Sequence, residues 1–130
     1  MADKRAFANP QRLDQPFHFT SAGKIYSPQR YLVGWPDGIV KVGSTDNGRK
    51  RWGPFLRRGA EMLDLANYGK DGSEMHAELW LQAQLRSRFS RAFASKPEAA
   101  PYLGSRGAGY LECYSIPVSR WPEIVDLARS

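Results

Sequence analysis

A short stretch of the chain holds residue types that suit chemistry on a phosphate group. Gly43 ends the run Lys41-Val42-Gly43, Ser44 follows it, and Arg51 comes soon afterwards. Arginine is always charged and can bind two phosphate oxygens at once, while glycine lets the backbone pass close to a ligand. Hydrolysis of a phosphodiester needs a group that steadies the charge on the phosphate, together with an activated water.

Basic side chains gather around this stretch. The chain carries a formal net charge of +6, an excess that favours polyanionic partners. Each basic group alone is typical of a solvated helix face, but several arginine-rich groups beside one candidate site favour contacts to phosphate. The groups are Arg49, Lys50 and Arg51; Arg57 and Arg58; and Arg86, Arg88 and Arg91.

The elements expected around these residues begin with a β-hairpin. Residues 30–35 and 39–43 have strand composition, and Pro36-Asp37-Gly38 between them is a strong turn signal. Residues 44–47 are rich in helix-capping types, which predicts a helix carrying Arg49 to Trp52. Gly53-Pro54 should break or restart this helix, because proline lacks the N–H that a helix interior needs.

Further along the chain, the pattern predicts a third strand over residues 61–68 and a long amphipathic helix over about residues 74–93. Residues 94–108 contain several Gly and Pro and indicate a loop. Residues 109–116 alternate as a strand does, and residues 117–128 predict a final short helix. Its inward side chains would be Trp121, Ile124, Val125 and Leu127.

Residues 1–27 have no sustained period and predict an irregular arm ahead of a domain of residues 28–130. Part of the arm should pack on the domain through its apolar residues, which are Phe17, Phe19, Ile25 and Tyr26.

The order of these elements and their motifs resemble the GIY-YIG nuclease superfamily, above all its phage-type branch, whose second motif often reads Lys-Val/Ile-Gly. The first motif falls on Gln29-Arg30-Tyr31, of which the tyrosine matches, and the second on Lys41-Val42-Gly43. The run from Gly43 to Trp52 is similar to the family's glycine, Ser/Thr and later arginine. The resemblance covers about residues 30–89 and, more weakly, residues 110–114. An alternative first motif, Lys24-Ile25-Tyr26, is rejected because Pro28 would fall inside the strand.

The resemblance implies a fold and an activity. The fold is α+β, with a small three-stranded, mainly antiparallel sheet flanked by helices, to which this chain adds a C-terminal strand and a short helix. The activity is hydrolysis of phosphodiesters in DNA, most readily duplex DNA, with one divalent metal, Mg²⁺ or Mn²⁺. Tyr31 would lie beside the attacking water and Arg51 would bind the phosphate. Lys41 stands where the family often has a second tyrosine, and Gly43 and Ser44 form the turn.

The family's metal ligand is a glutamate on a helix that reads Leu-Glu-x-x-Leu-His-x-x-Phe. The best match here is residues 81–89, which puts Gln82 in the glutamate column and Arg86 in the histidine column. Glutamine lacks the negative charge that hard divalent ions prefer. Three explanations stay open: a degenerate site that binds without cutting, a carboxylate supplied by Glu78 one turn earlier, or an engineered inactivation.

Two other functions compete with cleavage. A DNA-binding module on the same scaffold would use exposed cations for backbone contacts, namely Arg49, Lys50, Arg57, Arg58 and Arg86. A small, phage-encoded protein-interaction protein would instead use exposed aromatic residues such as Trp35, Trp52 and Trp80.

Several classes of protein are disfavoured by composition. Cys113 is the single cysteine, so an intrachain disulfide and a Cys-rich zinc site are excluded, and a reducing, cytoplasmic setting is expected. Cys113 itself is expected to be a partly buried strand residue. The apolar runs fall far short of the roughly 20 residues that a membrane span needs, and the N-terminus lacks the apolar core of a secretory signal.

Overall fold

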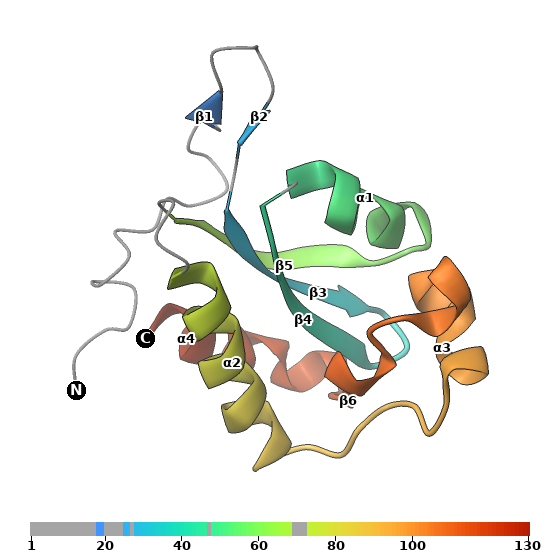
Figure 1. The fold of residues 1–130 in the computed structure, drawn as a ribbon. Helices are drawn as coiled ribbons and strands as arrows, with labels where there is room; N and C mark the ends of the chain where they lie inside the picture. The colour runs from blue at the N-terminus through green and yellow to red at the C-terminus, as the bar shows by residue number, and fades with distance from the viewer. Residues whose placement is uncertain (1–17, 20–24, 27, 47, 69–72) are drawn as a thin grey trace.

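A four-stranded antiparallel sheet lies at the centre of the structure, a computed structural model that describes residues 18–19, 25–26, 28–46, 48–68 and 73–130 (Figure 1). Its strands are β3 (Gln29–Trp35), β4 (Ile39–Thr45), β5 (Glu61–Asn67) and β6 (Cys113–Ser115), in the order β5-β3-β4-β6. The α+β class is confirmed. The prediction of a three-stranded sheet is wrong, because the C-terminal strand joins the same sheet by pairing with β4.

Helices cover both faces of this sheet. On one face, α1 (Gly48–Arg57) and α3 (Lys96–Leu103) pack on a core that includes Tyr31, Phe55 and Cys113. On the other face, α2 (Ser73–Arg86) and α4 (Trp121–Arg129) pack on a core that includes Val42 and Tyr114. Successive strand residues point to opposite faces, so neighbours such as Lys41 and Val42 are sent to different sides.

The β3–β4 hairpin is confirmed. Trp35 pairs with Ile39, and the Gly38 N–H donates to the Trp35 carbonyl to close the turn. Gly38 adopts a φ of +98°, a conformation that glycine reaches without steric cost. The third strand and the final helix are confirmed as well, and Trp121 and Ile124 of α4 are buried.

Four predicted elements differ from the structure. α1 continues through Gly53-Pro54, because Trp52 and Phe55 on either side are both buried and hold the helix on the sheet. α2 ends at Arg86 rather than near Phe93, since the chain then turns toward β6, where the Ser115 N–H donates to the Ser90 carbonyl.

The segment expected to be a loop contains α3, and its Pro97 lies in the first helical turn, where the missing N–H costs nothing. The last predicted strand is shorter than expected: residues 110–112 form a 3₁₀ turn, η3 (Tyr110–Glu112), before β6 begins.

The arm and the aromatic residues can be compared with the structure only in part. Within the arm, β1 (His18–Phe19) pairs with β2 (Ile25–Tyr26), while Phe17 lies outside the described residues. The suggested exposure of tryptophans is wrong for Trp35 and Trp52, which are 3% and 4% exposed. Among the described residues, no helix is long and apolar enough to cross a membrane.

Candidate functional site

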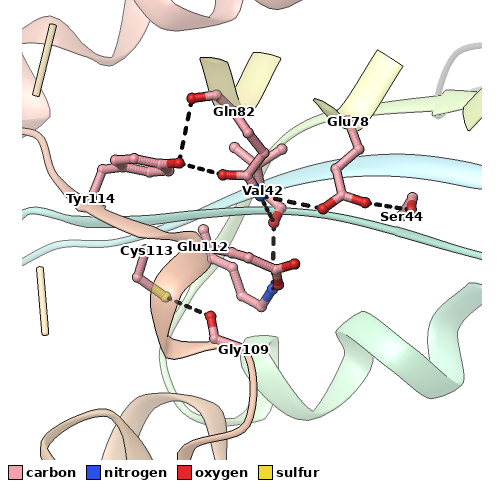
Figure 2. Close-up of polar contacts among 9 residues, drawn as sticks. Val42, Ser44, Glu78, Gln82, Gly109, Glu112, Cys113 and Tyr114 are labelled. Atoms are coloured by element: carbon pink, nitrogen blue, oxygen red, sulfur yellow. Dashed lines mark hydrogen bonds and ion pairs between the residues drawn. The ribbon is translucent and has the colours of Figure 1, made fainter. Parts of the chain in front are cut away.

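The candidate site is organised around an edge of β4. β6 pairs with residues 39–41 of β4, and beyond them the Val42 carbonyl oxygen accepts hydrogen bonds from side chains. Gln82 Nε2 donates to it at 3.1 Å from the α2 side, and Lys41 Nζ lies 3.4 Å away on the other side. Two faces of the sheet are therefore joined through one carbonyl group (Figure 2).

On the α2 side, both oxygens of the half-buried Glu78 carboxylate accept hydrogen bonds. Ser44 Oγ donates to Oε1 at 2.6 Å, and Gln82 Nε2 lies 3.3 Å from Oε2 (Figure 2). Ser44 belongs to the end of β4, immediately after the glycine of the Lys-Val-Gly motif. The structure thus brings Glu78 and the turn residue Ser44 into direct contact.

The amide of Gln82 has a fixed orientation. The Val42 carbonyl can only accept, so the amide nitrogen faces it and the amide oxygen faces Tyr114, whose hydroxyl donates to it. Burial raises the pKa of Tyr114, although Arg86 and Arg91 act against this, so Tyr114 keeps the proton that it donates. Gln82 is 4% exposed and acts here as a support for Glu78 and β4.

On the opposite face, Lys41 is fully buried and forms an ion pair with Glu112, with Nζ and Oε1 2.6 Å apart. Burial alone would lower the pKa of Lys41, but Tyr31 and Glu112 outweigh it and raise that pKa above its ordinary value. Lys41 therefore stays charged. Its Nζ lies 5.5 Å from the centre of the Tyr31 ring and 5.7 Å from that of Phe55.

Tyr31 lies directly beneath Gly43, its partner across the β3–β4 ladder. A Cβ atom added to Gly43 would lie 2.1 Å from the Tyr31 hydroxyl oxygen, so only glycine fits there. The Tyr31 side chain is fully buried, and its hydroxyl has no hydrogen-bond partner among the residues that the structure describes. A buried hydroxyl without a partner is uncommon in proteins and calls for an explanation.

The two residues that precede Tyr31 in the first motif hold the sheet together. Gln29 donates to Asn67 and accepts from the indole of Trp52. Arg30 is fully buried and forms an ion pair with Asp64. These contacts tie β3 to β5 and α1, so both side chains have a structural role in the sheet.

Arg51 is exposed on α1 and lines a shallow depression together with Lys50 and Phe55. The other candidate cations are spread over the surface. Arg49 stacks on Trp52, Arg57 is exposed at the end of α1, and Arg58 reaches the Pro101 carbonyl of α3. Arg86 ends α2 on the other side of the sheet.

Glu112 is the residue that the sequence pattern did not single out for a role. Its segment matched only a weak strand motif, and its partner Lys41 lies 71 positions earlier in the chain. Cys113 beside it is buried, and burial raises the pKa of its thiol to about 12. A thiol with that pKa is protonated at neutral pH and is a poor nucleophile.

The side chains around Glu78 offer few free ligands for a divalent ion. Mg²⁺ is commonly held by one or two carboxylates, with waters and substrate phosphates completing its shell. Glu78 supplies one half-buried carboxylate, whereas the Gln82 amide oxygen is already engaged by Tyr114. Among the described residues no three His, Cys, Asp or Glu side chains form a cluster. The residues therefore fit an ion held by Glu78 and otherwise by water and phosphate.

Comparison with known proteins adds no relative: no family model, no curated protein and no solved structure matches this chain.

Proposed function

We propose that this protein binds duplex DNA and hydrolyses its phosphodiesters with one divalent metal, Mg²⁺ or Mn²⁺, held by Glu78. The observation that carries the proposal is the chain of hydrogen bonds from Ser44 through Glu78 and Gln82 to the Val42 carbonyl, and from there to Lys41 and Glu112. It links a carboxylate and a buried cation at the strand edge where Gly43 covers Tyr31. Such a concentration of polar groups has a cost in stability, and sites of function commonly carry it.

Each residue has a distinct task in this proposal. Arg51 lies on the α1 face, across the sheet from Glu78, and binds a backbone phosphate of the DNA, because its guanidinium is exposed and can contact two oxygens. Gln82 holds the Glu78 carboxylate in place, and Lys41 keeps a positive charge beneath the site. Tyr31 offers a hydroxyl whose proton has no acceptor in residues 28–46, 48–68 and 73–130. When bound, the metal would neutralise phosphate charge and lower the pKa of a bound water.

Binding without cleavage is the second candidate function. It is favoured by one observation: both oxygens of Glu78 already accept hydrogen bonds, so a metal would have to compete with Ser44 and Gln82. In that case the exposed cations of α1 would supply affinity through phosphate contacts alone, and that affinity would fall as salt rises.

Plasmid nicking in Mg²⁺ or Mn²⁺ tests the first proposal. We expect the wild type to nick supercoiled plasmid, Arg51→Ala to lower the rate by about 100-fold or more, and Glu78→Gln to remove the metal-dependent activity. Glu123→Gln, an exposed acid on α4, is the matched control and should retain full activity.

Nicking by Glu78→Gln at the wild-type rate would exclude Glu78 as the metal ligand. A wild-type protein that shifts DNA in a salt-sensitive manner but never nicks it would support the binding function instead.

A further inference from the structure

The depression beside Arg51, between α1 and the segment after α3, contains further residues to which no role has been given. Its volume is about 100 Å³. Pro54, Phe55 and Leu103 provide apolar surface, and the polar side chains that line it are those of Lys50, Arg51 and Ser105. This combination of two cations and a hydroxyl suits a small anion.

The cations of the depression meet no acidic partner in the described part of the chain. Among the residues that the structure describes, neither Lys50 nor Arg51 forms an ion pair, and both are exposed. The Ser105 hydroxyl likewise makes no hydrogen bond within the described part of the chain. A phosphate oxygen would therefore meet donors that are free to turn toward it.

The segment that carries Ser105 has an unusual backbone. Ser105 and Arg106 have φ values of +46° and +61°, and Gly104, Gly107 and Gly109 are also positive. Left-handed conformations are disfavoured for residues with a Cβ atom, and consecutive ones are rare. Here they turn the chain so that Ser105 and Ala108 both line the depression.

The depression is physically connected to the site on β4. Phe55, which lines it, has its ring centre 6.0 Å from that of Tyr31 and 5.7 Å from Lys41 Nζ. At the end of the same segment, a Cβ atom on Gly109 would lie 3.3 Å from Lys41 Nζ and 3.2 Å from Glu112 Oε1. A phosphate in the depression would thus be separated from Lys41 by a single aromatic ring.

We propose that this depression binds one backbone phosphate of the nucleic acid, held by Arg51 together with Lys50 and the Ser105 hydroxyl. The inference deepens the proposed function, on which it rests for the class of ligand, but it does not depend on cleavage. Residues 104–109 would then form a phosphate-binding segment. This segment would set how the DNA strand lies over Tyr31 and Lys41.

Fluorescence anisotropy with a labelled duplex of about 20 base pairs, in EDTA so that cleavage cannot occur, tests the proposal over NaCl from about 50 to 200 mM. Lys50→Ala should lower the slope of log affinity against log salt by about one, since one phosphate contact is lost. Ser105→Glu places a negative charge in the depression, which repels phosphate and should weaken DNA binding by about tenfold or more. Arg120→Ala is the control, because Arg120 is exposed just before α4 and its charge is already paired with Glu123, so this change should affect binding less than either.

Wild-type slopes and affinities for both Lys50→Ala and Ser105→Glu would overturn the proposal, provided that circular dichroism shows both variants folded. The two proposals fail separately. If the wild type never nicks plasmid but Lys50→Ala lowers the salt slope, the proposed hydrolysis is refuted and phosphate binding in the depression is supported. If the wild type nicks plasmid but the slopes of both variants stay at the wild-type value, hydrolysis is supported and phosphate binding in the depression is refuted.

Discussion

Replacing Tyr31 by phenylalanine should make the protein more stable. The Tyr31 hydroxyl is fully buried and has no hydrogen-bond partner in the part of the chain that the structure describes. On folding it loses its bonds to water and gains none, so it opposes folding by the desolvation cost of a polar group, roughly 1–3 kcal/mol. Tyr31→Phe removes that cost and leaves the ring contacts with Phe55 intact.

The magnitude follows from the surroundings of the hydroxyl. Loss of the hydroxyl leaves a small void beneath Gly43, and this void offsets part of the stabilisation. We therefore expect a net increase of about 1 kcal/mol in the free energy of unfolding. For a chain of 130 residues this corresponds to a rise in Tm of roughly 3–4 °C.

Urea unfolding measured beside Tyr114→Phe provides the assay. The chemical change is the same, but the Tyr114 hydroxyl donates to Gln82, whose oxygen would be left buried without a donor. Tyr114→Phe should therefore lower stability by about 1–3 kcal/mol, the opposite sign. If both variants lose stability by similar amounts, the Tyr31 hydroxyl has a partner and the reasoning is wrong.

Three further changes test other contacts. Gly43→Ala should destabilise by about 3 kcal/mol, because its Cβ would lie 2.1 Å from the buried Tyr31 hydroxyl, and thermal unfolding would detect the loss; an unchanged Tm would contradict the packing. Glu112→Gln should cost about 2 kcal/mol, less than for a fully buried pair since Glu112 is 36% exposed. Because the pKa of Lys41 is raised, the wild type should exceed Glu112→Gln in free energy of unfolding by the full amount below about pH 10, and this difference should shrink as pH rises through that pKa. Urea unfolding at several pH values would show the change. A difference that stays constant with pH would argue against the ion pair. Finally, native Cys113 should resist iodoacetamide at pH 8 and react once unfolded, as mass spectrometry would reveal, because the pKa of its thiol is about 12; rapid native labelling would exclude this burial.

Local patterns predicted the elements whose signals are local. The β3–β4 hairpin followed from β-branched runs around Pro36-Asp37-Gly38, and the apolar spacing of α2 placed Leu81 and Leu85 in the core. The errors arose where tertiary packing prevailed. Pro54 stays inside α1 because burial of Trp52 and Phe55 outweighs the lost backbone hydrogen bond.

The candidate site was predictable only in part for the same reason. Spacing proposed Tyr31 and Lys41 as site residues and put Gln82 in the metal-ligand column, with Glu78 as an alternative one turn earlier. It could not show that Gln82 holds its neighbours instead, because the direction of its amide is set by Val42 and Tyr114 from two different strands. The pairing of Lys41 with Glu112 depends on where β6 joins the sheet, which no local period encodes.

The hydrogen bonds at the Val42 carbonyl also bear on how the molecule behaves among copies of itself. A strand edge with free carbonyl groups can pair with another chain and start aggregation. Here two side-chain nitrogens, from Gln82 and Lys41, already bond that carbonyl where pairing with β6 stops. The side chains that organise the candidate site therefore also close part of the sheet's edge, so changes such as Gln82→Leu should promote self-association.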